Sequence, residues 1–109
     1  MVSSNPTKLV ELDPADVQMR LTQGDVVLID VREPPELAAE RIPGALSMPL
    51  STFDPAALPC EPERAVFSCA AGGRSAKAVE RCQQAGVAVT QHMRGGLKAW
   101  KAAQLPTTR

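Results

Sequence analysis

The segment from Cys69 to Ser75 combines residue types that stabilise a reactive anion. Cys69 directly follows the apolar run Ala65–Ser68, and the residues after it are Ala70, Ala71, Gly72, Gly73, Arg74 and Ser75. The two glycines let the backbone curl with its amides pointing inward, and the helix expected next adds unpaired N–H groups and the positive end of its dipole. Arg74 adds a permanent positive charge. We therefore expect the pKa of the Cys69 thiol to lie below the ordinary value of about 8.5, which makes Cys69 a candidate nucleophile.

Two of these residues also have structural interpretations. Arg74 could bind an anion, or it could pair with a carboxylate such as Glu33 and stiffen the segment, and the sequence leaves both open. Ser75 is expected to cap the N-terminus of the next helix, where it would orient the amides. Apolar packing is the default interpretation of a lone cysteine, but the Gly-Gly-Arg-Ser context at a strand-to-helix turn favours a functional Cys69.

The elements that must position this segment alternate between strands and helices. Apolar runs predict strands over 9–12, 26–29, 46–48, 65–68 and 87–89. Caps and breakers predict helices over 13–24, over 35–40, from the Cys69 segment to Ala85, and after Gly95-Gly96 up to Pro106, with a loop or short helix over 51–58. This alternation predicts an α/β fold with a largely parallel sheet, in which ligands bind beyond the carboxyl ends of the strands.

Three polar segments fall at predicted strand ends, so we expect them on one rim: Asp30-Val31-Arg32, the Cys69 segment and Arg94-Gly95-Gly96. The charges at positions 30 and 32 are expected mainly in structural roles, because a strand-end Asp commonly bonds nearby backbone. Four further side chains are expected to be packed or to lie in loops without a catalytic role: His92, Trp100, Cys82 and Cys60. A resolving thiol is the less favoured interpretation of Cys60.

Four motifs occur in the order seen in rhodanese domains: Leu28-Ile29-Asp30-Val31-Arg32-Glu33, Arg41-Ile42-Pro43-Gly44-Ala45, Cys69-x-x-Gly72-x-Arg74-Ser75 and Gly95-Gly96-Leu97-x-x-Trp100. The chain resembles a single-domain rhodanese, with one domain spanning 1–109 and a core of about 9–107. The resemblance implies a five-stranded, mostly parallel sheet flanked by helices on both faces. It also implies sulfane sulfur transfer through a persulfide of Cys69, with residues 70–75 binding the substrate or persulfide and with Asp30, Arg32 and Arg41 in support.

The loop spacing and several departures refine this resemblance. Four residues separate Cys69 from Arg74, as in rhodaneses, whereas related phosphatases and arsenate reductases have five and usually a His before the Cys, where this chain has Ser68. Position 41 is Arg where many members have His, and Gln104 stands where a Gly often occurs, so we expect a changed helix end there. Ala70 replaces a frequent Arg, which predicts a neutral, open entrance that captures small dianions such as thiosulfate less well.

Composition restricts the classes of function. Twelve Lys and Arg balance twelve Asp and Glu, which argues against a nucleic-acid-binding protein. No apolar run approaches the roughly 20 residues that span a bilayer, and residues 1–8 do not resemble a signal peptide. We therefore expect a cytoplasmic protein without a membrane partner. The odd number of cysteines suits a reducing compartment and their spacing suits no metal, so neither a metal nor an organic cofactor is expected.

The predicted activity is that of a thiosulfate sulfurtransferase-like enzyme. The donor would be thiosulfate or a protein persulfide, and the acceptor would be cyanide, a thiol or a protein cysteine. Two alternatives stay open: a non-enzymatic or partner-specific sulfur-relay or redox module, and a cysteine-dependent phosphatase or arsenate reductase.

Overall fold

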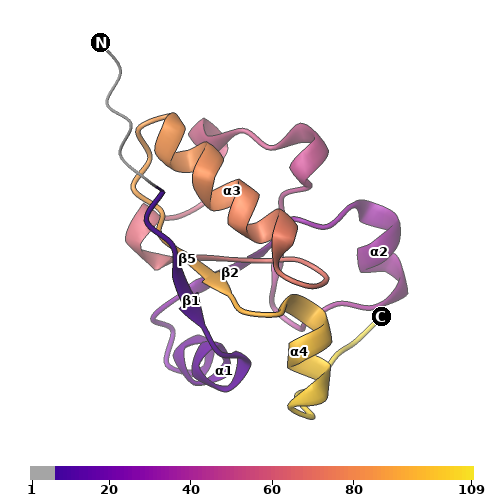
Figure 1. Cartoon of the computed structure of the whole chain (residues 1–109). Coiled ribbons are helices and arrows are strands. Elements are labelled where there is room, and N and C mark those ends of the chain that lie inside the picture. The colour runs from indigo at the N-terminus through magenta and orange to yellow at the C-terminus, as the bar shows by residue number, and fades with distance from the viewer. Residues whose placement is uncertain (1–6) are drawn as a thin grey trace.

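Residues 7–109, which the computed structural model describes, form a single five-stranded sheet in the order β1-β5-β4-β2-β3 (Figure 1). The strands are β1 Val10–Leu12, β2 Val27–Asp30, β3 Leu46–Ser47, β4 Ala65–Ser68 and β5 Gln91–Met93. Neighbouring strands of this sheet pair in parallel, which confirms the expected α/β sheet. The start of the predicted domain and most of the polar 1–8 segment fall in residues 1–6, outside the described residues.

Helices cover both faces of the sheet. They are α1 Pro14–Thr22, α2 Pro34–Ala39, α3 Gly73–Gln84 and α4 Gly96–Ala102, and short 3-10 turns lie at Leu50–Thr52, Pro55–Ala57 and Pro62–Arg64. α3 lies on one face, and α1 and α4 lie together on the other (Figure 1). Among the described helices, none has the length and apolar character that crossing a membrane requires.

Each central strand sends alternate side chains into two separate cores. Leu28 and Val66 face α1 and α4, together with Trp100, which is only 2% exposed. Ile29 and Phe67 face α3 on the other side of the sheet. β2 and β4 are buried on both faces, and their sequences are apolar up to their last residues, Asp30 and Ser68, as in covered parallel sheets.

The predicted strand over 87–89 is wrong, and the last strand lies a few residues later at β5. The Val87 amide donates to the Cys82 carbonyl (2.8 Å) and the Val89 amide donates to the Val87 carbonyl (2.9 Å), so this segment turns tightly at the end of α3. β5 carries polar residues instead, including half-buried Gln91 and buried His92. The Gln91 side chain donates to the Glu63 carbonyl (3.3 Å), so its polarity is satisfied by a distant segment.

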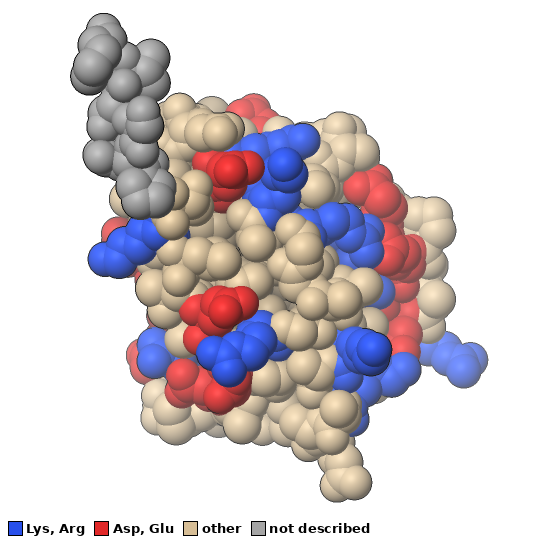
Figure 2. Space-filling model, in the orientation of Figure 1, with Lys and Arg blue, Asp and Glu red and all other residues tan. Residues whose placement is uncertain are grey.

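α4 ends in a left-handed stop, in which the Leu105 amide donates to the Trp100 carbonyl (3.2 Å). Trp100 is anchored there, because its Nε1 donates to the Pro106 carbonyl (2.8 Å). Gln104 has φ +62°, a left-handed conformation that favours glycine. Gln104 therefore takes the conformation that a glycine would take at this position, and the helix end expected to change keeps the usual left-handed form. On the face shown in Figure 2, basic and acidic side chains are interspersed, in keeping with the zero formal net charge.

Candidate active site

Cys69 lies at the carboxyl end of β4, inside the turn that leads into α3. Its Sγ accepts a hydrogen bond from the Gly72 amide (3.0 Å), and the residue is 1% exposed. Burial alone would raise the pKa of the thiol. Hydrogen bonds from the Ser75 hydroxyl and from the amides of Ser75, Gly72 and Ala71 outweigh burial and hold the pKa of Cys69 below its ordinary value, the direction expected from the sequence.

The other two cysteines differ from Cys69 in this respect. Burial raises the pKa of half-buried Cys60, and it raises the pKa of buried Cys82 to about 11. Cys82 packs in the core against α3's face of the sheet, as expected. Cys60 packs beside the same core, so it is less open than a loop thiol would be. Of the three thiols, Cys69 is the one whose surroundings favour the nucleophilic thiolate.

Contrary to the prediction, Ser75 is not the N-cap of α3. The N-cap is Gly72, whose φ of +112° glycine adopts without strain, and α3 begins at Gly73. Ser75 is therefore the third residue of the helix, where its amide is still free of intrahelical bonding and points toward Cys69. Its Oγ lies 3.6 Å from Cys69 Sγ. Ser75 thus contributes both a hydroxyl and an amide to the cysteine.

The start of α4 contacts the segment from Cys69 to Ser75, which we call the Cys69 loop. The Leu97 amide donates to the Cys69 carbonyl (2.7 Å) and the Lys98 amide donates to the Ala70 carbonyl (3.0 Å). Gly96 makes this approach possible, because a Cβ there would overlap the Cys69 carbonyl oxygen and lie 2.7 Å from the Ala70 carbonyl carbon. The segment around Gly95-Gly96 therefore lies on the same rim as the loop, as predicted.

Arg74 forms a two-pronged ion pair with a carboxylate of α2. Its Nη1 lies 2.7 Å from Glu36 Oε1 and its Nη2 lies 2.9 Å from Glu36 Oε2. The Arg74 hydrogen bonds lower the pKa of Glu36 to about 2. Of the two roles left open, the structure has the pairing role, but the partner is not Glu33. The Glu33 carboxylate instead accepts the Ser51 hydroxyl (2.6 Å).

Asp30 and Arg32 form a buried ion pair, and within residues 7–109 no hydrogen bond joins either side chain to Cys69. Arg32 Nη2 and Nε lie 2.8 Å and 3.1 Å from Asp30 Oδ2, and the residues are only 4% and 1% exposed. Arg32 also donates to the Glu40 carbonyl (2.8 Å) at the end of α2. The pair therefore joins β2 to α2, and through Glu36 it supports the segment that holds Arg74.

Arg41 is placed away from this arrangement. Its backbone pairs with Thr108 in an isolated antiparallel bridge, with both N–H···O distances 2.8 Å, and the residue is exposed. Among the residues from 7 onward, no hydrogen bond or ion pair joins its side chain to the Cys69 loop. The structure therefore gives Arg41 a backbone role at the C-terminal segment.

Two hollows flank the loop. One of about 300 Å³ is lined by Ala70, Leu97, Lys98 and Lys101. Lys101 is paired with Glu40 (2.7 Å), whereas Lys98 enters no ion pair within residues 7–109. The surroundings of Ala70 are therefore cationic rather than neutral as expected, because α4 supplies the charge that position 70 lacks.

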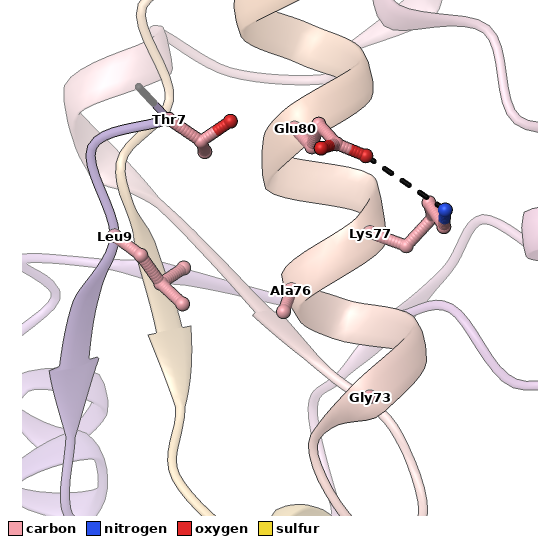
Figure 3. A pocket seen from close by; sticks show the side chains of 6 residues that line it. All are labelled: Thr7, Leu9, Gly73, Ala76, Lys77 and Glu80. Atoms are coloured by element: carbon pink, nitrogen blue, oxygen red, sulfur yellow. Dashed lines mark ion pairs between the residues drawn. The ribbon is translucent and has the colours of Figure 1, made fainter.

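The second hollow, of about 330 Å³, lies beside the start of α3 on the side toward β1 (Figure 3). It is lined by Thr7, Leu9, Gly73, Ala76, Lys77 and Glu80. The ammonium of Lys77 lies 3.8 Å from the Glu80 carboxylate. The described residues of this lining include no thiol or imidazole.

His92 is the residue that sequence reasoning left out of the site. It is buried, and its Nδ1 lies 2.7 Å from Ser75 Oγ while its Nε2 lies 3.1 Å from Glu11 Oε2. Its place just before Arg94-Gly95-Gly96, at a strand end on the same rim, was the available signal. No group of three or more candidate metal ligands gathers in the part of the chain that the structure describes.

Comparisons with known proteins find rhodanese-like relatives of this chain. A family model for the rhodanese-like domain matches residues 13–103. An uncharacterized protein of Synechocystis is 42% identical over 110 residues, covering this whole chain but 61% of that protein. A sulfurtransferase of Allochromatium vinosum is 34% identical over 98 residues, covering 88% of this chain and 92% of that one.

Solved structures share the same fold. A rhodanese-related protein of Thermoplasma volcanium has a TM-score of 0.77 at 28% identity, over 90% of this chain and 96% of that one. A Rhodopseudomonas palustris protein described as a possible tyrosine phosphatase has a TM-score of 0.75 at 30% identity, over 92% and 85%. With the matched domain covering most of its length, this chain belongs to the rhodanese-like domain family.

Proposed function

We propose that this protein is a sulfurtransferase that carries sulfane sulfur as a persulfide on Cys69. The observation that carries the proposal is the cradle around Sγ, where the Gly72 amide donates at 3.0 Å and the start of α3 adds further amides. Fixed amide donors favour negative charge on sulfur. The name of the Allochromatium relative supports the sulfurtransferase family in general. The specific donor and acceptor are part of the proposal.

In the first half-reaction, the Cys69 thiolate attacks the outer sulfur of the donor. With thiosulfate, the new bond joins Sγ to the sulfane sulfur, the bond from that sulfur to the sulfonate breaks, and sulfite leaves with the electron pair. Cys69 becomes a persulfide anion, whose terminal sulfur the amides of residues 70–75 would bind. Because the attacking group is already a thiolate and sulfite is a stable anion, the leaving group needs no proton.

In the second half-reaction, a nucleophile takes the terminal sulfur and restores the Cys69 thiolate. Cyanide gives thiocyanate, and a thiolate gives a new persulfide on the acceptor. The hollow beside Ala70 is the proposed approach for either substrate, because apolar Leu97 and the ammonium of Lys98 line it. The Lys98 ammonium would attract an anionic donor such as thiosulfate.

A cysteine-dependent phosphatase is the second candidate, since the Rhodopseudomonas relative in fold is described as a possible tyrosine phosphatase. A tetrahedral oxyanion is best held by a free guanidinium fork. Here both terminal nitrogens of Arg74 are occupied by Glu36, at 2.7 and 2.9 Å. That pairing and the four-residue Cys69–Arg74 spacing favour sulfur over phosphate. Assays with an aryl phosphate and with arsenate test this alternative.

A partner-specific relay is the third candidate. Cys69 is 1% exposed, so a protein partner that seats on the rim could be better placed to deliver sulfur than a free small anion. This version predicts slow persulfide formation from thiosulfate and fast formation from a protein persulfide. Three free cysteines suit a reducing compartment, so we include a cytoplasmic location in the proposal.

Steady-state thiosulfate:cyanide transfer tests the proposal. Purified wild-type protein is compared with Cys69→Ser and with the matched control Cys82→Ser, and thiocyanate is measured. We expect activity in the wild type and in Cys82→Ser, and none in Cys69→Ser. Full activity in Cys69→Ser would rule out the Cys69 persulfide.

A further inference from the structure

A continuous line of polar side chains leads away from Cys69 into the sheet. Ser75 Oγ lies 3.6 Å from Cys69 Sγ and 2.7 Å from His92 Nδ1. His92 Nε2 lies 3.1 Å from Glu11 Oε2. Ser75 and His92 are 0% and 2% exposed, while Glu11 lies at the exposed outer strand. The parallel register of β1 and β5 sets Glu11 directly opposite His92.

The hydrogens in this line have one consistent direction. A carboxylate only accepts, so His92 Nε2 must carry a hydrogen and donate it to Glu11. In a neutral imidazole Nδ1 is then an acceptor, and it takes the Ser75 hydroxyl hydrogen. The Ser75 oxygen is left to accept from the Cys69 S–H. The Gly72 carbonyl, 3.1 Å from Ser75 Oγ, competes for the same hydroxyl hydrogen.

We propose that His92, held by Glu11, accepts through Ser75 the proton that Cys69 loses when it becomes a nucleophile. The Cys69 S–H bond breaks as its proton bonds to the Ser75 oxygen, and the Ser75 O–H bond breaks as that proton bonds to His92 Nδ1. The products are a thiolate, a Ser75 hydroxyl that now donates to it, and an imidazolium that donates to Ser75 and Glu11. The net charge of the line is unchanged.

This arrangement resembles the logic of a nucleophile, base and orienting carboxylate, with a serine hydroxyl between nucleophile and base. His92 acts only through Ser75, so it is a positioning residue. The inference rests on the proposed role of Cys69 and deepens it, since it names how the resting thiol is ionised.

Within residues 7–109, the titratable groups joined to His92 by hydrogen bonds are Glu11 directly and Cys69 through Ser75. β4 presents uncharged Phe67 in register with it, and the loop presents Gly72, where a Cβ would lie 3.9 Å from His92 Cε1. From β1, Glu11 supplies the carboxylate, and from α3, Ser75 links the ring to Cys69. The nearest cation along β5, Arg94, is exposed and pairs with Asp13 (3.4 Å).

Alkylation of Cys69 by iodoacetamide tests the proposal, because it reports the thiolate and needs no sulfur donor. The rate is measured from mildly acidic to alkaline pH, with the modified cysteine identified by mass. In mildly acidic buffer we expect His92→Leu and Ser75→Ala each to lower the rate about tenfold, the effect of losing a hydrogen bond to a charged group. The double variant should be no slower than Ser75→Ala alone. A further full loss on adding His92→Leu to Ser75→Ala would overturn the line through Ser75.

A second variant and a spectroscopic signal keep the test independent of folding. His92→Asn keeps an N–H that can reach Ser75 but takes up no proton, so its rate should also fall; a wild-type rate in folded His92→Asn contradicts the proposal. His92 is the only histidine of the chain, so its ring ¹⁵N signals are read without overlap. They should change as Cys69 ionises and stop doing so in Cys69→Ala. His92 ring ¹⁵N signals that do not change as Cys69 ionises would overturn the proposal.

The outcome is separable from that of the proposed function. If wild-type Cys69 gains no sulfur, sulfur transfer fails while the alkylation and ring-nitrogen results keep their meaning. If Cys69 gains sulfur but its alkylation rate does not change in the His92 variants, sulfur transfer stands and proton transfer to His92 through Ser75 is refuted.

Discussion

Replacing Gly96 by alanine should damage the site without touching a reacting atom. Gly96 has φ +58°, and a Cβ there would overlap the Cys69 carbonyl oxygen and lie 2.7 and 2.8 Å from the carbonyl carbon and oxygen of Ala70. All three atoms are backbone, so no side chain can turn aside. The clash falls on the two carbonyls that Leu97 and Lys98 amides hold. Gly96→Ala must therefore push α4 and the Cys69 loop apart.

Substitutions at two other glycines separate the backbone strain from the overpacking in the stability that Gly96→Ala should lose. Gly44 has φ +84° with open space around it, so Gly44→Ala carries only the left-handed strain, about 1 kcal/mol. Gly73 has neither a positive φ nor a neighbour within 4 Å, so Gly73→Ala should be neutral or slightly stabilising. Gly96→Ala adds overpacking of about 1–3 kcal/mol to the strain, for a total loss of about 2–4 kcal/mol.

Urea unfolding followed by fluorescence of Trp100, the only tryptophan, measures all three variants. Cys69 alkylation on the folded proteins then reports the site. We expect the free energy of unfolding to fall in the order Gly73→Ala, Gly44→Ala, Gly96→Ala, with slowed alkylation in the last alone. Equal stability of Gly96→Ala and Gly44→Ala would refute the claimed contact between α4 and the Cys69 loop.

Three further predictions concern charge and backbone around the loop. The Glu36 carboxyl, whose pKa falls from 4.5 to about 2, adds stability that is full above pH 4.5 and is lost as the pH falls toward 2. The shift corresponds to about 3 kcal/mol at most, and the exposure of about a third of each side chain reduces this to about 1 kcal/mol. The free energy of unfolding, measured as the pH is lowered, should show this loss in the wild type and not in Glu36→Gln. Parallel curves for the two proteins would contradict the prediction. Lys98→Ala should raise the KM for thiosulfate several-fold, as expected for one exposed charge, while alkylation by neutral iodoacetamide stays unchanged; an unchanged KM would remove Lys98 from the donor path. Gln104→Gly should raise the free energy of unfolding by about 0.5–1 kcal/mol by relieving φ +62°, with Gln18→Gly, inside α1, as a destabilising control. A destabilised Gln104→Gly would contradict the strain.

The Cys69 loop was predictable because its chemistry is local. A buried strand, two glycines and a helix start are neighbours in sequence, so amides near Sγ follow from chain geometry. The same holds for β4, whose bounds match the expected 65–68 run. Elements whose character comes from adjacent residues are therefore accessible without a structure.

The wrong predictions for β5 and for the partner of Arg74 have a different cause. In both, the hydrogen-bond partners are residues far away in the sequence. β5 was missed because Gln91 and His92 are satisfied by Glu63, Glu11 and Ser75, which lie far away in the chain. Arg74 reaches Glu36 rather than Glu33, and these carboxylates are only three residues apart on α2 and its N-cap. No local pattern distinguishes them, because the docking of α2 against α3 decides which one Arg74 meets.

Intact mass of the wild-type protein after incubation with thiosulfate, and again after cyanide, is the most direct test of sulfur transfer through Cys69. Cys69→Ser, Cys60→Ser and Cys82→Ser serve as the comparison set. We expect a gain of one sulfur atom that cyanide removes, present in both control variants and absent in Cys69→Ser. A gain that persists in Cys69→Ser, or no gain from thiosulfate or a protein persulfide in the wild type, would contradict a Cys69 persulfide.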